Sequence, residues 1–212
     1  MVCLAKWFSF TSLVMTCLLL LHPGNAMKVL VIGGTGCVGS KIVSELLRKG
    51  VDTHLLVRKL PLADTNPKLG GAILHLGDIN IAQDIVKASS GCDAIIAVHD
   101  RRPVPFRRHT DLFIYPRHDP THPYNLHYLS TQRILLAMEI NKIPKLVHLT
   151  GSLVEQSAFF PFVAFFTMLF SGVVRWHERG ERSIRKSTVD YTIIRCPKIL
   201  DEPPLASLPE GR

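Results

Sequence analysis

The sequence is poor in cysteine and has no two cysteines in the spacing Cys-x-x-Cys. Only 5 of its 212 residues are cysteine, and those that follow the first 26 residues, Cys37, Cys92 and Cys196, are far apart. Such spacing forms neither a disulfide framework nor a cysteine-based zinc site. The fold must therefore be held by its hydrophobic core, and 47% of the residues are hydrophobic, which is enough to form one.

Charge is nearly absent from residues 1–26, where Lys6 is the single charged residue. The apolar run Trp7–Leu21 is shorter than the about 20 residues that span a membrane. This segment is predicted to be a signal peptide that directs the chain to the secretory pathway, the endoplasmic-reticulum lumen or an organelle. An uncleaved anchor, or a true start at Met27 with a cytoplasmic protein, is the alternative. The folded domain is expected to span 27–212.

Short β-branched segments alternate with longer amphipathic ones after this leader. The alternation is typical of a parallel sheet with crossover helices. Six strands are expected, at Lys28–Ile32, Thr53–Val57, Ala72–Leu76, Ala94–Val98, Lys145–Leu149 and Tyr191–Arg195. Later helices are expected at Ile81–Ser89, Leu126–Asn141 and Trp176–Lys186. The predicted fold class is α/β, a doubly wound parallel sheet of about six strands.

The first helix follows the first strand directly. Val38, Ile42 and Leu46 recur every four residues, so they are expected to share one face and to pack on the sheet. Gly50 is expected to end this helix.

Between that strand and that helix lie three glycines in the spacing Gly-x-x-Gly-x-x-Gly. In a dinucleotide-binding loop the first permits a tight turn, the second lets the pyrophosphate approach the backbone, and the third lets helix and strand pack closely. Amide groups at the helix start then bind phosphate. The expected cofactor contacts here are Gly33, Thr35, Gly36, Cys37, Val38 and Gly39. The flanking strand and helix favour nucleotide binding over an ordinary glycine-rich turn.

The end of the second strand distinguishes between two dinucleotides. An NAD site usually carries Asp or Glu about 20 residues after the loop, whereas an arginine suits the 2′-phosphate of NADP. Here the strand ends in Val57, Arg58 and Lys59, without an acid. Arg58 is therefore expected to bind the phosphate and NADP to be preferred over NAD. A solvated basic turn is the alternative.

The third strand is followed by Gly77, Asp78 and Ile79. Ligands of such sheets bind at the carboxyl ends of the strands. Asp78 is expected to accept from the adenine amino group and Ile79 to pack against the ring. Asp78 is alternatively, or in addition, the N-cap of the next helix.

These motifs and two later segments resemble the atypical short-chain dehydrogenase/reductases, especially the NmrA-like and flavin or biliverdin-IXβ reductase-like branch. The matching segments are Gly33–Gly39, Val57-Arg58, Gly77-Asp78, Leu146–Ser152 and Glu181–Arg195. The resemblance covers Met27 to about Leu205. It implies a Rossmann fold, NADP along the strand tips, and Thr150 or Ser152 near the nicotinamide or its ribose. Family members generally continue through another strand and helix, so the final strand and helix are expected to be missing here.

The sequence lacks the Tyr-x-x-x-Lys pair that supplies the acid in typical short-chain dehydrogenases. None of its 4 tyrosines is followed by lysine at that spacing. By the resemblance, Val173 occupies the tyrosine position and His177 the lysine position. His177 is the candidate catalytic residue, as a donor to ribose or a proton source for substrate. The alternative is an exposed histidine on a charged helix.

Two segments are candidates for contacting a partner. Phe159–Phe170 is apolar, and it is expected to form a buried lid or substrate wall, with peripheral membrane or protein contact as the alternative. The loop after the fourth strand is rich in arginine, which would steer an anionic substrate. A solvated basic loop is the alternative for that segment.

Metal and nucleic acid are not expected as partners. His118, His122 and His127 with Asp119 match no strong metal-ligand spacing. The formal net charge is +8, but aromatic residues are not interleaved with the cations as in nucleic-acid-binding proteins, and a dinucleotide accounts for the charge.

Two functions remain open. The first is an NADPH-dependent reductase that passes hydride to an apolar or planar acceptor, since the cofactor supplies the chemistry. The second is a non-catalytic NADP-binding redox sensor, assembly factor or scaffold, which the absent tyrosine and lysine favour.

Overall fold

The computed structural model describes residues 27–59, 69–100, 119–151, 154 and 173–196. The strands are β1 (Lys28–Ile32), β2 (Asp52–Val57), β3 (Ile73–Leu76), β4 (Ala94–Ala97), β5 (Lys145–Gly151) and β6 (Asp190–Cys196). The helices are α2 (Cys37–Arg48), α3 (Ala82–Ala88), η3 (Tyr124–Leu129), α4 (Ser130–Asn141) and α6 (Val173–Lys186). The leader 1–26, the loop 101–118 and Phe159–Phe170 lie outside the described residues.

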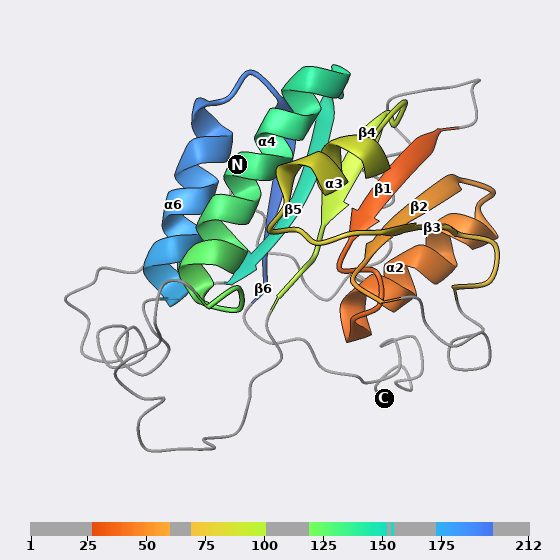
Figure 1. The fold of residues 1–212 in the computed structure, drawn as a ribbon, viewed down its shortest axis with the longest axis horizontal. Coiled ribbons are helices and arrows are strands. Elements are labelled where there is room, and N and C mark those ends of the chain that lie inside the picture. Colours follow the sequence, from red (N-terminus) through yellow and green to blue (C-terminus); the bar gives the residue numbers. More distant parts are fainter. Residues whose placement is uncertain (1–26, 60–68, 101–118, 152–153, 155–172, 197–212) are drawn as a thin grey trace, which may run out of the picture.

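All six strands form one parallel sheet in the order β3-β2-β1-β4-β5-β6 (Figure 1). From β1 the chain builds outward through β2 to β3, then crosses back to β4 and builds outward on the other side. The predicted Rossmann-type doubly wound sheet is confirmed. Strand order reverses between β1 and β4, and sheets of this kind bind ligands at that point.

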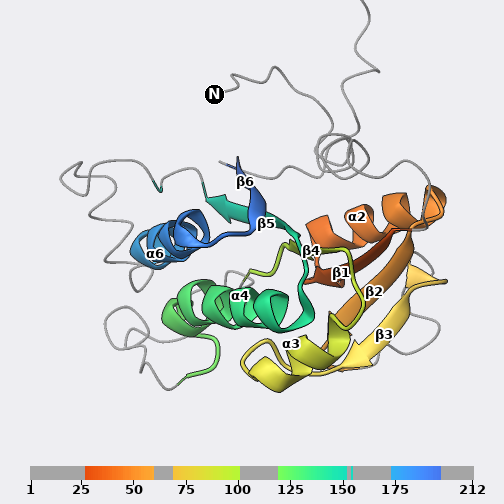
Figure 2. The same ribbon diagram turned by 90° about the horizontal axis from the view of Figure 1, so that it is seen from above.

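The helices cover the two faces of the sheet unequally. Figure 2 shows α2 on one face and α3, α4 and α6 on the other. Side chains of β1 alternate accordingly, because successive residues of a strand point to opposite faces. Val29 and Val31 pack in the core beneath α2, and Leu30 and Ile32 pack in the core beneath the other helices. Burial of both faces explains why the central strands β1 and β4 are almost continuously apolar.

Gly50 ends α2, as predicted. Its φ of +72° lies in the left-handed region that favours glycine. The amide of Gly50 donates to the carbonyl of Leu47 (3.0 Å), and the amide of Val51 donates to that of Leu46 (3.0 Å). This pair of bonds satisfies carbonyls at the helix end in the Schellman pattern.

The expected helix from Leu126 to Asn141 differs in its first part. Residues Tyr124–Leu129 form a wide π-helical turn, and the α-helix begins only at Ser130. Side-chain hydroxyls compete for the carbonyls here: Ser130 Oγ donates to the carbonyl of Leu126, and Thr131 Oγ1 to that of His127 (2.7 Å). Such back-bonding weakens and often bends a helix, and wide turns of this kind are often found at functional sites.

Among the described residues, no helix combines the length and the apolar character that crossing a bilayer requires.

Candidate functional site

The glycine loop has the close packing that its spacing predicts. Gly33 has φ +91°, and a Cβ there would lie 2.7 Å from the backbone of His99. A Cβ on Gly39 would lie 2.1 Å from the carbonyl oxygen of Gly33, so α2 can approach the loop only with glycine at this position. Gly34, to which the sequence assigns no role, packs under the side chain of Leu55. A Cβ added at Gly34 would lie 2.6 Å from that side chain.

The start of α2 faces this loop and is open to an anion. Gly36 is the N-cap, in extended conformation, and no side chain caps the helix. The first bond within the helix runs from the amide of Ser40 to the carbonyl of Gly36 (2.9 Å). The amides of Cys37, Val38 and Gly39 therefore precede the hydrogen-bonded part of the helix, as an anion site requires. Thr35 and Cys37 are exposed beside them.

Arg58 lies at the same edge of the sheet, one residue past the end of β2. Its side chain is exposed, as is that of Lys59. Strand β2 pairs in parallel with β1, and Ile32 is opposite Leu56. The glycine loop and Arg58 therefore follow neighbouring strands at nearly the same height along the sheet. A dinucleotide that contacts both requires this arrangement.

Asp78 holds the turn after β3. Its Oδ1 accepts from the amide (2.8 Å) and the side chain (3.0 Å) of Asn80, and its own amide donates to Asp84 (2.9 Å). Helix α3 begins later than the sequence suggests, with Ile81 as N-cap, so the expected N-cap role for Asp78 is wrong. Ile79 is buried in the core beneath α3 and α4.

Thr150 lies near the end of β5 and is buried. Its hydroxyl donates to Oε1 of Glu181 on α6 (2.7 Å). Because its hydrogen is used in this bond, the Thr150 hydroxyl can interact with a cofactor only as a hydrogen-bond acceptor. Ser152, the other expected contact, lies outside the described residues.

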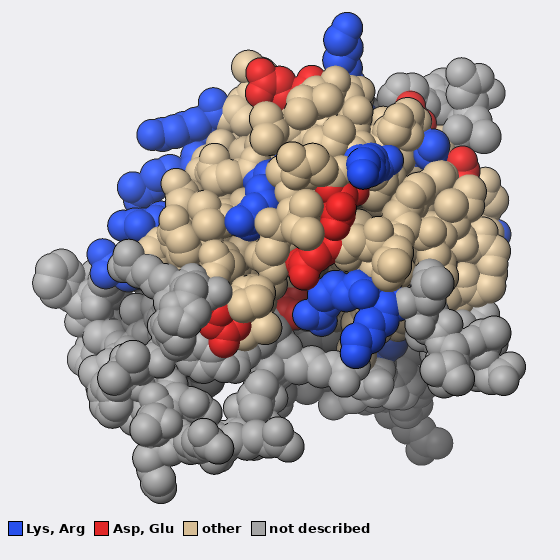
Figure 3. Space-filling model, in the orientation of Figure 1, with Lys and Arg blue, Asp and Glu red and all other residues tan. Residues whose placement is uncertain are grey.

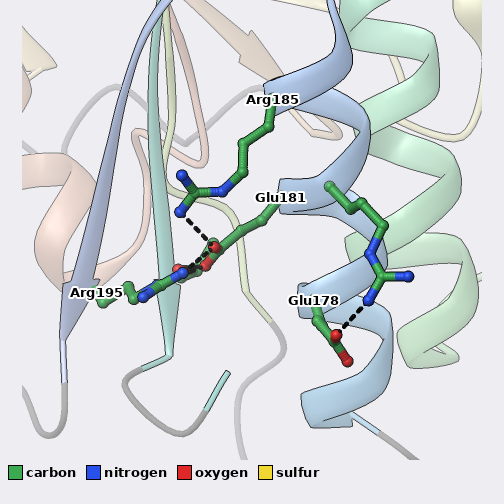
Figure 4. A network of polar contacts seen from close by, with 6 residues as sticks. Glu178, Glu181, Arg185 and Arg195 are labelled. Carbon is green, nitrogen blue, oxygen red and sulfur yellow. Dashed lines mark hydrogen bonds and ion pairs between the residues drawn. The ribbon is translucent and has the colours of Figure 1, made fainter. Parts of the chain in front are cut away.

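Glu181 is the centre of an ionic network that sequence reasoning did not assign to the site (Figure 4). Arg195 of β6 donates to it twice, from Nε to Oε1 (3.1 Å) and from Nη2 to Oε2 (2.6 Å). Arg185, one turn further along α6, lies 3.5 Å away. Burial alone raises the pKa of Glu181, but the hydrogen bonds from Arg195 and Thr150 and the charges of both arginines outweigh it, so the pKa is lowered.

The other face of α6 is strongly basic. Its exposed cations are Arg175, Arg179, Arg182, Arg185 and Lys186. Blue side chains project along α6 at the left edge of Figure 3. Two of these cations lie near an acid: Arg182 pairs with Glu178 at 2.6 Å, and Arg185 lies 3.5 Å from Glu181.

His177 is buried, which excludes the exposed histidine considered from sequence. Its ring stacks on that of His127, with 3.8 Å between centroids and 28° between planes. Burial and the neighbouring His99 lower the pKa of His177 to about 4, against a smaller opposite effect of Glu181. At neutral pH His177 is therefore an uncharged imidazole, able to donate one N–H but not to act as a cation. Its catalytic role stays a prediction.

Four histidines gather around this position. His99, His127, His148 and His177 are all well buried or half-buried between the sheet and α4 and α6. Nε2 of His99 lies 2.9 Å from the carbonyl of Leu126 and 3.0 Å from Ser130 Oγ. Burial lowers the pKa of His99 to about 4 and those of His127 and His148 well below their usual range. The cluster is neutral at physiological pH.

This cluster is not apparent from the sequence, in which His127 stands near His118, His122 and Asp119 rather than near the other three histidines. His118 lies outside the described residues. Asp119 and His122 take part in the local turn: Asp119 Oδ1 accepts from Thr121, and His122 Nδ1 accepts from the amide of Tyr124. One available signal was the alternation in β5, which puts His148 and Thr150 on the same face.

The site thus has two halves on either side of the point where strand order reverses. The glycine loop, Arg58 and Asp78 form one half, at the ends of β1, β2 and β3. The other half holds Thr150 and His177. A glycine loop and an uncapped helix start at this point of a doubly wound sheet are typical of dinucleotide-binding proteins.

Comparisons with known proteins agree with this class. The family model described as NAD(P)H-binding matches residues 33–208. The isoflavone reductase homolog P3 of Arabidopsis thaliana is 38% identical over 78 residues, which are 33% of this chain and 25% of the relative. The photosystem II assembly factor Ycf39 of Cyanophora paradoxa is 26% identical over 169 residues, 80% of this chain and 44% of the relative.

Among solved structures, a short-chain dehydrogenase/reductase superfamily protein of Agrobacterium tumefaciens with bound NAD shares the fold. Its TM-score is 0.58 at 17% identity, over 79% of this chain and 48% of that one. The chain belongs to the NAD(P)H-binding family of atypical, NmrA-like short-chain dehydrogenase/reductases. The chain thus covers 25% of the length of the first of these two curated relatives and 44% of the length of the second.

Proposed function

We propose that the chain is an NADP(H)-dependent reductase that passes hydride to an apolar or planar acceptor. The observation that supports this proposal is that two features lie at the same edge of the sheet. Helix α2 starts without a side-chain cap, and the exposed Arg58, rather than an acid, follows the neighbouring strand β2. A guanidinium can bind a 2′-phosphate through two parallel hydrogen bonds. An acid at that position would instead favour the free ribose of NAD.

The proton in this reaction would come from solvent or from a neutral group. His177 is uncharged at neutral pH because its pKa is about 4. It is therefore assigned an orienting role, through its N–H, toward ribose or substrate. The hydride comes from the cofactor, and the protein positions the reactants and excludes water.

The test has two stages. Isothermal titration of the purified chain with NADPH and NADH is expected to give at least about tenfold tighter binding of NADPH, the effect of one charged hydrogen-bonded contact. Consumption of NADPH is then followed with flavin, quinone and carbonyl acceptors. Equal or tighter binding of NADH contradicts the cofactor assignment, and binding without turnover on any of these acceptors contradicts the reductase assignment.

The second candidate is a non-catalytic NADP-binding assembly factor or scaffold. It is supported by Val173 and His177 at the positions where typical members have the tyrosine and lysine, and by the relative described as a photosystem II assembly factor, which matches 80% of this chain. This function predicts NADPH binding with no turnover on any of the three acceptors, and steady consumption of NADPH with one of them argues against it.

A further inference from the structure

Three side chains that are distant in the sequence converge beside the dinucleotide site. Asp100 follows β4, His127 lies in the wide turn η3, and His177 lies on α6. Each offers one ligand atom, and these atoms all lie within 4.8 Å of one another. Oδ1 of Asp100 and Nε2 of His127 are 3.6 Å apart.

These separations are close to those around a metal ion. Ligand atoms at about 2.0–2.1 Å from a tetrahedral zinc ion are separated from one another by roughly 3.3 Å. The Asp100–His127 pair is already near this value. The rings of His127 and His177 are stacked, with 28° between their planes, so one ring must turn about its Cβ–Cγ bond for both to bind one ion.

A second observation also points to a ligand beside His177. Nδ1 of His177 is buried and has no hydrogen-bond partner among the described groups, and the residue as a whole is 9% exposed. A buried polar atom without a partner is costly and calls for an explanation, such as an ion. The exposed side chain of Asp100, 69% accessible, leaves a route from solvent to this position.

We infer that Asp100, His127 and His177 form a binding site for a divalent transition metal. Two imidazoles and one carboxylate are the donor set of open zinc sites and of non-haem Fe²⁺ sites, which leave positions for water or substrate. Zn²⁺ is the ion to test, because it has no redox chemistry of its own and accepts this donor set readily. This inference departs from the prediction, made from the sequence, that the chain binds no metal.

The site lies close to the glycine loop. Asp100 is the neighbour of His99, whose backbone is in contact range of Gly33. An ion held here would lie at the carboxyl edge of the sheet, in the half that contains Thr150 and His177. The three ligand atoms all come from this chain, so binding of the ion can be measured without the dinucleotide.

The experiment uses the full chain without a polyhistidine tag, stripped with EDTA and then titrated with ZnCl₂ in the calorimeter. One ion per chain is expected, and Asp100→Asn, His127→Gln and His177→Gln should each weaken binding by at least about tenfold, since loss of even an outer-shell partner of a ligand costs about that much. Replacement of zinc by Co²⁺ should give the visible absorption of a low-symmetry site with nitrogen and oxygen ligands.

The matched control is His75→Gln. His75 stacks on His54, with 5.0 Å between ring centroids, and His54 in turn lies 3.3 Å from Asp52. It therefore belongs to a second histidine pair beside an aspartate, and zinc affinity should be unchanged in this variant.

Absence of stoichiometric binding overturns the inference. So does equal weakening in His75→Gln, or unchanged affinity in Asp100→Asn. Asp100→Asn decides the matter if the buried histidine variants fail to fold, because an exposed side chain can be changed without loss of the core. None of these results bears on NADPH binding, which is measured without zinc.

Discussion

The carboxylate of Glu181 and the guanidinium of Arg195 form a two-bond ion pair between α6 and β6, with an Nη2–Oε2 distance of 2.6 Å. Glu181 is 2% exposed and Arg195 is 23% exposed at the side chain. A third bond, from Thr150, ties the same carboxylate to β5. One buried acid therefore connects three elements around the candidate site.

Glu181→Gln should lower the free energy of unfolding by about 2–4 kcal/mol, because it leaves Arg195 partly buried without its counter-charge. Chemical denaturation monitored by circular dichroism measures the change. Glu178→Gln is the control: Glu178 pairs with Arg182 on the exposed face of the same helix (Figure 4), and its loss should cost under about 0.5 kcal/mol. Equal losses in the two variants would show that burial of the pair is unimportant.

Stability in acid should depend on the same carboxylate. Its pKa is below the ordinary value of 4.5, so its contribution to folding is complete above that value. The contribution is lost as pH falls below about 4.5 through the lowered pKa of the folded state. The groups facing it are Thr150 on β5, Arg195 on β6, and Arg185 and His177 on α6. The stability difference between wild type and Glu181→Gln should shrink as the pH is lowered from 5 toward 3, whereas a constant difference speaks against the ionic explanation.

Gly39→Ala should weaken dinucleotide binding by at least about tenfold and destabilise the fold by about 1–3 kcal/mol, as overpacking does. The added Cβ would lie 2.1 Å from the carbonyl oxygen of Gly33, so α2 must move away from the loop. Ser44→Ala, at an exposed position of the same helix, should leave both quantities nearly unchanged. Titration with NADPH and thermal unfolding of the two variants give the comparison, and normal binding by Gly39→Ala would contradict the close approach.

Arg58→Ala should weaken NADPH binding by roughly tenfold or more, since hydrogen bonds to charged groups contribute about 1.5–3 kcal/mol. NADH, which has no 2′-phosphate, should bind with unchanged affinity. Lys59→Ala changes the adjacent exposed cation and should have a smaller effect on NADPH. If Arg58→Ala weakens both dinucleotides alike, the arginine does not select between them.

Lys142→Gly should stabilise the protein by about 0.5–1 kcal/mol, because Lys142 ends α4 with φ +55°, a conformation that costs other residues energy. Lys87→Gly, in the last turn of α3, should instead destabilise, by about 1 kcal/mol, the ordinary effect of glycine within a helix. Urea unfolding of both variants tests the contrast. A loss of stability in Lys142→Gly would show that its side chain contributes more than its backbone costs.

Much of the fold could be predicted from the sequence because its signals are local. Each strand is a short segment rich in β-branched or other apolar residues, and the predicted strand positions agree with the structure to within one or two residues at each end. The glycine loop is also local, with all its members within seven residues. Arg58 follows from its place at the end of a strand, without any knowledge of tertiary contacts.

The histidine cluster could not be predicted, because its members come from four separate segments. His99, His148 and His177 have no other member of the cluster near them in the sequence, and the histidines closest to His127 in sequence are His118 and His122, which are not members. Their proximity depends on the strand order and on how α4 and α6 pack on the sheet. His127 also lies in the wide turn η3, where Ser130 and Thr131 donate side-chain bonds to the carbonyls of Leu126 and His127.

The alternation of side chains along β5 sets a limit on how this region can change. Val147 packs beneath α2, whereas His148 and Thr150 face α4 and α6. Insertion or deletion of a single residue ahead of His148 would turn every following side chain of the strand to the opposite face. Thr150 would then lose Glu181, although no residue of the site had been replaced. The length of this strand, counted from Lys145, is thus as strict a requirement as the identity of its polar residues.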